Sequence, residues 1–179
     1  IARRQRQMCI RDRDYPLADI SAIIITVSDR SFAGRHQDKS GPRAAESLIK
    51  AGFTRPQVRV IPDGIESVRD ALKQAIADGY RLIVTTGGTG IGPRDLTPEA
   101  TAAVIATRIP GIENQILHHG LSSTPTAGLS RPVIGLTDRS SKAALIINAP
   151  GSTGGVTDTL DVITPLCGHI FSQLAGGKH

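Results

Sequence analysis

The sequence predicts an α/β protein: a three-layer, doubly wound, mostly parallel sheet with helices on both faces. Two observations lead to this prediction. Short β-branched runs alternate along the chain with segments whose apolar residues recur at helical spacing. Several strand-like runs are also followed by glycine-rich or polar loops just before a helix. Loops after parallel strands lie together at one edge of a sheet, so we expect them to form a common crevice.

The composition favours one domain that does not span a membrane. We expect a basic, flexible arm over residues 1–18 and a single domain over residues 19–179. Residues 1–14 carry no aromatics, which argues against nucleic acid as a partner despite the net charge of +5. No apolar run approaches the roughly 18 residues of a membrane span. Cys9 and Cys167 are far apart and outside any zinc-ligand spacing, which favours a reducing, cytoplasmic location.

The first strand is predicted over residues 20–27, a β-branched run without helical spacing that suits a strand covered on both faces. Polar residues 28–30 follow it, and a loop extends over residues 31–40. The next helix is predicted to open with Pro42 and to stop at Gly52, because Pro suits a first helical turn and Gly a helix end.

A second strand is predicted over residues 57–61. The helix after it has apolar residues at helical spacing, a capping box formed by Ser67 and Asp70, and a stop at Gly79. Residues 82–84 then form a short apolar run that is typical of a buried strand. This run opens the most informative segment of the chain.

A glycine-rich turn over residues 86–90 follows this strand, and its backbone N–H groups can approach a ligand without intervening Cβ atoms. A helix should start directly afterwards, with Thr97 as N-cap, Pro98 in the first helical position and an end near Arg108. Unpaired N–H groups and the helix dipole then both favour an anion. A dinucleotide fingerprint and a P-loop are both excluded, because Pro93 stands where they need glycine or lysine.

The second half of the chain is predicted to add a short helix and two strands. The helix covers residues 112–119. His118 and His119 are adjacent, so they cannot share a helical face as metal ligands at i, i+4 do, and we expect both on the surface. Residues 133–136 and 143–147 are the predicted strands, and the short link between them favours an antiparallel pair.

A third glycine-rich loop, residues 148–155, precedes the last helix. That helix should bury one apolar face, and Pro165 predicts a kink or a restart within it. Together with loops 28–41 and 86–97, this loop should gather at the carboxyl edge of the sheet. Strand-end loops of this kind form the ligand crevice.

Two aspartates, Asp38 and Asp95, stand in equivalent positions, each in a loop just before a predicted helix. A carboxylate beside a phosphate-binding loop repels the ligand unless it holds a divalent cation, so both are candidate Mg²⁺ ligands. The alternative is that both are helix-entry acids that accept hydrogen bonds from local backbone, and their positions leave this open. Arg131 is a candidate phosphate contact, although a loop Arg is usually solvated.

Several segments of the chain carry motifs that occur together: residues 27–30, 38–41, 85–90, 93–95, 97–100, 130–131, 148 and 150–152. They resemble the molybdopterin adenylyltransferase family of molybdenum-cofactor biosynthesis, which includes the Mog and MoaB proteins and the G domain of gephyrin. The Thr-Thr-Gly-Gly-Thr-Gly block, followed by Arg-Asp and Thr-Pro-Glu-Ala-Thr, is a specific signal. The resemblance spans nearly the whole chain apart from the basic arm.

The resemblance implies a three-layer fold, usually a homotrimer, that binds molybdopterin and ATP with Mg²⁺. The phosphate of molybdopterin attacks the α-phosphorus of ATP in that family, which gives adenylyl-molybdopterin and pyrophosphate. Asp38 and Asp95 match the two carboxylates important for activity, and other cofactor-biosynthesis proteins are possible partners. Substrate or nucleotide binding is expected at Ser28, Asp29, Ser40, Gly41, Thr86, Gly87, Gly88, Thr89, Gly90, Thr97, Ser130, Arg131, Asn148, Pro150, Gly151 and Ser152.

Two positions depart from the family pattern, which commonly has Glu where Asn114 stands and Arg where Leu117 stands. Two other functions remain compatible with the sequence. One is a MoaB-like protein or scaffold that holds molybdopterin without adenylylating it. The other is a related domain that acts on a different nucleotide, as in CinA-type proteins.

Overall fold

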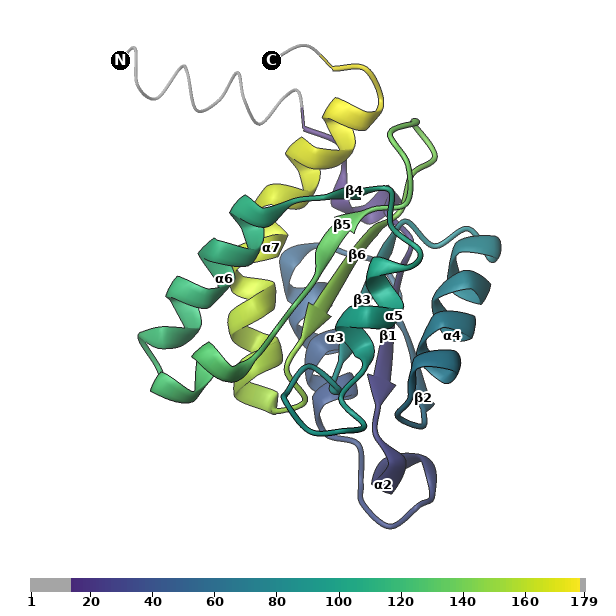
Figure 1. Ribbon diagram of the computed structural model, residues 1–179. Helices are drawn as coiled ribbons and strands as arrows, with labels where there is room; N and C mark the ends of the chain where they lie inside the picture. Colours follow the sequence, from purple (N-terminus) through teal and green to yellow (C-terminus); the bar gives the residue numbers. More distant parts are fainter. Residues whose placement is uncertain (1–13, 178–179) are drawn as a thin grey trace.

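A six-stranded sheet forms the centre of the computed structural model, which describes residues 14–177 (Figure 1). The strands are β1 (Ala22–Val27), β2 (Gln57–Ile61), β3 (Leu82–Thr86), β4 (Thr107–Arg108), β5 (Ile134–Leu136) and β6 (Leu145–Ala149). Their order across the sheet is β2-β1-β3-β6-β5-β4. β1, β2, β3 and β6 run parallel, and β5 is antiparallel to both of its neighbours. The mostly parallel sheet and the antiparallel last pair are confirmed.

Helices cover both faces of the sheet, which confirms the predicted three layers. The helices are α2 (Asp29–Phe32), α3 (Ser40–Ala51), α4 (Ile65–Ala77), α5 (Thr97–Ala102), α6 (Pro110–Leu121) and α7 (Thr153–Leu174), with short 3-10 turns η1 (Leu17–Asp19) and η2 (Pro125–Leu129). Apolar side chains of α3, α6 and α7 join one core cluster, and those of α4 and α5 join the other. In Figure 1, α6 and α7 lie on the opposite side of the sheet from α4.

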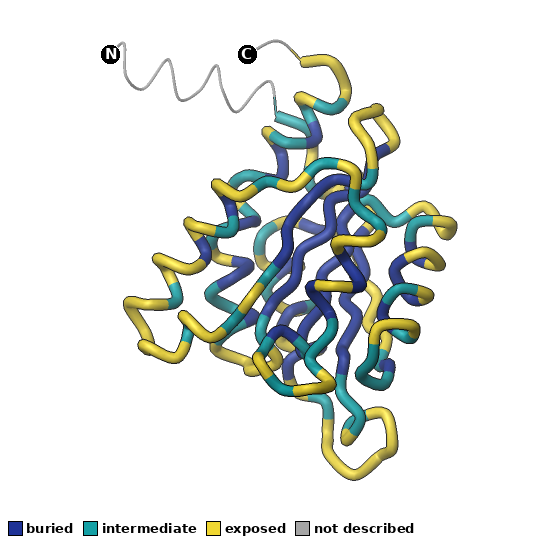
Figure 2. Tube along the Cα trace, in the orientation of Figure 1, coloured by how far each residue is buried: buried dark blue, intermediate teal, exposed yellow. Residues whose placement is uncertain are grey.

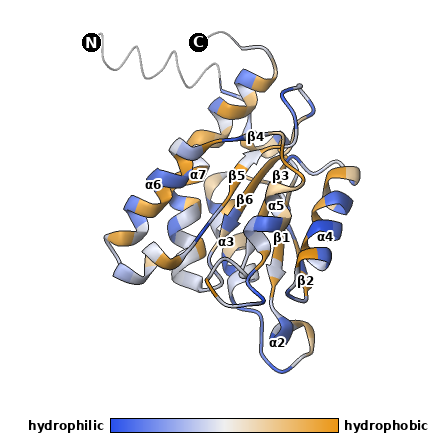
Figure 3. Cartoon of the chain, viewed as in Figure 1, coloured by the Kyte–Doolittle hydropathy of each residue, from blue (hydrophilic) through white to orange (hydrophobic). Residues whose placement is uncertain are grey.

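The two core clusters arise because successive side chains of a strand point to opposite faces. In β1, Ala22 and Ile24 belong to the cluster under α3 and α7, whereas Ile23 and Ile25 belong to the one under α4. All four are buried, and the strands form the dark blue centre of Figure 2. The covering helices are amphipathic, as the mixed colours of α4 in Figure 3 show. A strand buried on both faces explains the unbroken apolar run in the sequence.

The capping box predicted at Ser67 is wrong. α4 begins earlier, at Ile65, after Gly64 turns the chain with a φ of 115°. The Ser67 hydroxyl donates to the carbonyl oxygen of Pro62 at 2.6 Å and does not cap the helix. As predicted, α3 stops at Gly52 and α4 stops just before Gly79, and both glycines have positive φ.

The helix predicted from Pro98 to Arg108 is too long, since α5 ends at Ala102. Thr107 and Arg108 form the edge strand β4 instead, and Thr107 lies opposite Leu136 of β5. The error has a physical cause, because the pairing partner lies far along the chain and local spacing does not indicate it. The boundary of α3 also differs from the prediction, because this helix starts at Ser40 rather than at Pro42.

α7 runs from Thr153 to Leu174 with Pro165 inside it, so of the predicted kink or restart at this proline the restart does not occur. Ile163 and Cys167, on either side of the proline, are fully buried against the sheet, and this packing holds both halves of the helix in place. Within residues 14–177 no helix has the length and apolar character to cross a membrane.

The basic arm predicted over residues 1–18 is described only from residue 14, and residues 1–13 lie outside the described part. Its last residues contact α7. The backbone N–H of Tyr15 donates to the carbonyl oxygen of Gly168 at 3.0 Å, and the Tyr15 ring lies 6.3 Å from that of Phe171. Residues 14–18 therefore belong to the folded body.

Candidate functional site

A cleft of about 830 Å³ lies at the carboxyl ends of β1 and β3. Its walls come from the three loops that the sequence predicted to meet there: residues 28–40, 86–95 and 151–153. The position follows from topology, because the chain leaves β1 for α3 on one face of the sheet and leaves β3 for α5 on the other. Adjacent strands whose connections diverge in this way leave a crevice between them.

Asp38 lies at this cleft, just before α3. Its Oδ2 accepts a hydrogen bond from the Thr26 hydroxyl at 2.8 Å, and its Oδ1 accepts one from the backbone N–H of Gly41 at 3.0 Å. A Cβ on Gly41 would lie 2.4 Å from Oδ2 of Asp38, so only glycine leaves room for this carboxylate. The contact with the first turn of α3 means that Asp38 also acts as a helix-entry acid.

Asp95 lines the same cleft from the opposite loop. Its Oδ2 accepts a hydrogen bond from the backbone N–H of Gly92 at 2.9 Å. A Cβ on Gly90 or Gly92 would lie 2.9 or 2.8 Å from that oxygen, so the loop wraps closely around the carboxylate. Within residues 14–177, Oδ1 of Asp95 accepts no hydrogen bond. Both aspartates therefore face one cavity, as the sequence predicted.

The glycine loop lines the cleft and carries unpaired backbone donors. Gly87 and Gly88 have φ values of 108° and 68°, and the loop is held by the Gly87 N–H, which donates to the carbonyl oxygen of Ala149 at 3.0 Å. Among residues 14–177, no hydrogen bond uses the backbone N–H groups of Gly88, Thr89 or Gly90. Unpaired N–H groups of this kind are typical of loops that bind phosphate.

The first turn of α7 adds to these donors. Gly151, Ser152 and Thr153 line the cleft, and the Ser152 hydroxyl caps the helix by accepting from the N–H of Gly155 at 2.9 Å. The N-terminus of this long helix therefore points its dipole at the cavity, which favours a negative charge there. The cleft combines two carboxylates with an environment that otherwise attracts anions.

Asp29 does not stand free in the cleft, because it binds a residue of another loop. The Arg94 guanidinium donates to both of its carboxylate oxygens, at 2.6 and 3.0 Å, and also to the carbonyl oxygen of Asp63 at 2.9 Å. Asp63 and Asp29 exchange two further hydrogen bonds with each other's backbone N–H groups. The hydrogen bond from Arg94 lowers the pKa of Asp29 below its usual 3.8. We call Asp29, Asp63 and Arg94 the loop clamp.

Sequence reasoning assigned no role to Asp63 or Arg94. The available signals were the position of Asp63 in the turn directly after β2 and the position of Arg94 next to Asp95 in a motif segment. Neither signal indicates that the two residues meet, since their contact joins the ends of different strands.

Arg131 binds the backbone of the glycine loop. Its guanidinium donates to the carbonyl oxygens of Gly90 at 2.9 Å and Asp95 at 2.8 Å, and it pairs with Glu99. This pairing lowers the pKa of the Glu99 carboxyl. All these partners of the guanidinium are protein groups, so Arg131 is a positioning residue for the loop.

Thr97 and Asn148 are fully buried and do not line the cleft. The N-cap predicted at Thr97 is wrong: Leu96 occupies that position, and the Thr97 hydroxyl donates to the carbonyl oxygen of Gly87 at 3.0 Å. The Asn148 amide donates to the hydroxyls of Thr85 and Thr101. Both residues hold the glycine loop and its strand in place.

A smaller cavity of about 450 Å³ lies between α6, η2 and the start of α7. Among the predicted binding residues, Ser130, Arg131, Pro150 and Ser152 line it, and Ser152 lines the larger cleft as well. Asn114 and Leu117, the two departures from the family pattern, also line this smaller cavity. Thr97, Asn148 and Gly41, which is buried beside Asp38, line neither cavity. The remaining predicted binding residues line the larger cleft: Ser28, Asp29, Ser40, Thr86, Gly87, Gly88, Thr89, Gly90 and Gly151.

Asp38 and Asp95 suit Mg²⁺ in kind. This ion prefers oxygen ligands, and proteins usually bind it through one or two carboxylates together with substrate phosphates. The unused oxygen of Asp95 is available as a ligand for the ion. The unpaired N–H groups nearby are available to bind the substrate phosphates. The donor set thus agrees with the metal predicted from the sequence.

The fold and the site together define an α/β protein with a crevice at a topological switch point, lined by unpaired backbone N–H groups. Residues 23–169 match the family described as "Probable molybdopterin binding domain", and the chain belongs to this family. The resemblance inferred from the motifs is confirmed.

Named relatives and a solved structure agree with this assignment. The chain is 35% identical over 151 residues to the molybdopterin adenylyltransferase of Escherichia coli, covering 82% of this chain and 75% of the relative. It is 36% identical over 156 residues to the molybdenum cofactor biosynthesis bifunctional protein of Chlorobaculum tepidum, covering 87% of this chain but 49% of that protein. The chain thus spans about half the length of this bifunctional relative. The Mog protein structure from Mycobacterium ulcerans superposes with a TM-score of 0.79 at 43% identity, covering 88% of this chain and 97% of that one.

Proposed function

We propose that this chain adenylylates molybdopterin with ATP and Mg²⁺ and releases pyrophosphate. The observation that carries the proposal is the meeting of Asp38 and Asp95 in one cleft beside unpaired loop N–H groups. The relative from Escherichia coli, which is named molybdopterin adenylyltransferase, supports the choice of substrates.

The reaction requires two highly charged anions to meet. An oxygen of the molybdopterin phosphate forms a bond to the α-phosphorus of ATP, and the bond from that phosphorus to the β-phosphate oxygen breaks. Such a transfer depends mainly on position and on spreading negative charge, so no protein nucleophile is needed. The site has the backbone donors and acids that such a reaction requires.

Each group in the cleft has a defined task in this proposal. Asp38 and Asp95 hold Mg²⁺, which when bound neutralises charge on the reacting phosphates. The N–H groups of Gly88, Thr89 and Gly90 bind phosphate oxygens, as preorganised donors do at developing charge. The smaller cavity shares Ser152 with the cleft, so it offers adjoining space for a second substrate.

The test is to mix the protein with molybdopterin, ATP and Mg²⁺ and to measure adenylyl-molybdopterin and pyrophosphate. Asp95→Asn should lower turnover by at least about 100-fold, the usual cost of losing a group that stabilises charge in the transition state. Molybdopterin binding should stay largely intact in this variant. Asp19→Asn is the control and should retain full activity, because Asp19 is an exposed acid in η1, before β1, and does not line the cleft.

Unchanged turnover in Asp95→Asn would refute the role of this carboxylate. Normal pterin binding by the wild type, with no product and no dependence on ATP, would favour a MoaB-like binding protein or scaffold. Turnover of another nucleotide substrate in place of molybdopterin would favour a CinA-type activity. The homotrimer, the cytoplasmic location and contacts with other cofactor-biosynthesis proteins stay predictions.

A further inference from the structure

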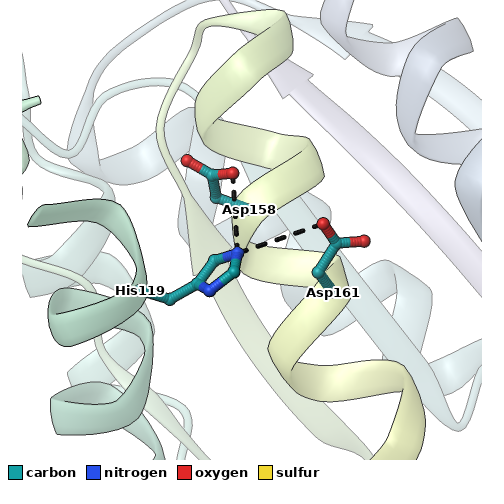
Figure 4. Close-up of side chains that lie close together, drawn as sticks. All are labelled: His119, Asp158 and Asp161. Carbon is teal, nitrogen blue, oxygen red and sulfur yellow. Dashed lines mark ion pairs between the residues drawn. The ribbon is translucent and has the colours of Figure 1, made fainter. Parts of the chain in front are cut away.

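A second group of potential metal ligands lies between α6 and α7, where His119 faces Asp158 and Asp161 (Figure 4). Nε2 of His119 is 3.7 Å from Oδ1 of Asp158 and 4.0 Å from Oδ2 of Asp161. One ligand atom from each residue lies within 4.8 Å of the others. We propose that these three side chains bind a divalent transition-metal ion, and that Zn²⁺ is the best match.

The arrangement follows from the packing of two helices. Asp158 and Asp161 are three residues apart on α7, so they share one face of that helix. The neighbouring residues Leu160 and Ile163 are buried against the sheet, which leaves the two acids toward α6. His119 lies near the end of α6 and completes the group from the other helix. The sequence could not indicate this, because the three residues come together only when α6 packs on α7.

The spacing fits a bound ion better than a hydrogen bond. Neither separation from Nε2 is within the range of about 2.7–3.2 Å for an N–H···O bond. Ligand atoms around tetrahedral zinc stand about 3.3 Å apart, given Zn–N and Zn–O bonds of about 2.0–2.1 Å. The observed 3.7 and 4.0 Å, like the 4.8 Å limit for the whole group, exceed that value, but all three side chains are at least partly exposed and can close on an ion.

The chemistry of the donors selects the ion. Imidazole nitrogen suits zinc and similar transition metals better than Mg²⁺ or Ca²⁺, and two carboxylates balance a charge of two. Three protein ligands leave a coordination position open, as in zinc sites that bind a further ligand. Asp158 also lines the smaller cavity, so the ion would lie at the rim of that cavity. The site is separate from Asp38 and Asp95, and the proposal does not depend on the proposed function.

Calorimetric titration of the full-length, metal-free protein with Zn²⁺ tests the proposal, and Co²⁺ absorption reports the coordination. We expect saturable binding of one ion that is lost or at least about 10-fold weaker in His119→Ala and in Asp158→Asn, since even outer-shell changes cost that much. His118→Ala is the matched control, because it removes another exposed histidine, the neighbour of His119 on the same helix. It should bind as the wild type does.

Other metal-binding groups are separated by further variants. Cys9→Ser and His179→Ala address groups outside the described residues, and Asp95→Asn addresses the cleft. Cys167 needs no variant, because burial raises the pKa of its thiol to about 12. Equal binding in His119→Ala and the wild type would overturn the proposal, as would no saturable binding by the wild type. A loss of thermal stability in metal-free His119→Ala, without any effect of Zn²⁺ on the wild type, would show a plain ion pair and overturn it too.

Discussion

Gly87 shows how single residues shape the cleft. A Cβ at this position would lie 2.3 Å from the carbonyl oxygen of Val27, and the φ of 108° belongs to glycine. The same holds at Gly88, where a Cβ would lie 2.3 Å from the Thr97 hydroxyl. The missing side chains let β1, the loop and α5 approach each other, and this approach holds the loop with its unpaired N–H groups at the wall of the cleft.

Gly87→Ala should therefore lower the free energy of unfolding by about 1–3 kcal/mol, the usual cost of a strained backbone. Gly128→Ala is the control, because its Cβ would meet nothing within 4 Å. We expect that control to change stability by no more than about 0.5 kcal/mol. Urea denaturation of the wild type and the two variants measures both changes in the free energy of unfolding. Equal stability of the two variants would contradict the stated role of Gly87.

The sequence predicted the position of residues whose role depends on their neighbours in the chain. It did not predict the role of residues whose partners lie elsewhere in the chain. The positions of Asp38 and Asp95 in strand-end loops predicted their shared cleft correctly. The buried role of Thr97 depends on Gly87, and that of Asn148 depends on Thr85 and Thr101. Nothing near either residue in the chain reveals those partners.

At the scale of elements, the loop clamp fixes the mutual position of three strand ends. Asp29 follows β1, Asp63 follows β2 and Arg94 follows β3. The forked guanidinium matches a carboxylate with two hydrogen bonds, and this geometry is lost with lysine. Because Asp95 is the next residue after Arg94, the clamp also sets the position of a proposed metal ligand.

Arg94→Lys should lower kcat/KM for adenylylation by about 10- to 100-fold, because small displacements of positioned groups have effects of that size. Thermal stability should change little, since the Arg94 side chain is 61% exposed. Arg43→Lys is the control, because Arg43 is in an exposed ion pair on α3. A steady-state comparison of both variants is the measurement, and equal activity would contradict the role of the clamp.

The loss of kcat/KM in Arg94→Lys should not change with pH near neutrality. The pKa of Asp29 is lowered by Arg94, so the ionised pair is fully present above the ordinary carboxyl value of 3.8. It is lost only as the pH falls through the lower folded-state pKa. The ratio of wild-type to Arg94→Lys activity should therefore show no titration near neutrality.

At the scale of the whole molecule, the alternation of strands and helices determined most of what the sequence could predict. It gave the parallel sheet, the two covered faces and the edge at which the loops meet. It did not give β4, because that short edge strand depends on pairing with β5. The switch between β1 and β3 brings together the loops that carry Asp38 and Asp95, and the proposed chemistry depends on that meeting.

The most direct test of this account is the binding of Mn²⁺, in place of Mg²⁺, to the protein with ATP, followed by electron paramagnetic resonance. The His119→Ala background removes the site between α6 and α7. We predict that Asp38→Asn and Asp95→Asn each weaken Mn²⁺ binding at least about 10-fold, and that their combined loss is smaller than the product of the two, as for residues that share one ion. Wild-type Mn²⁺ affinity in either single variant, or losses that multiply as for independent sites, would contradict it.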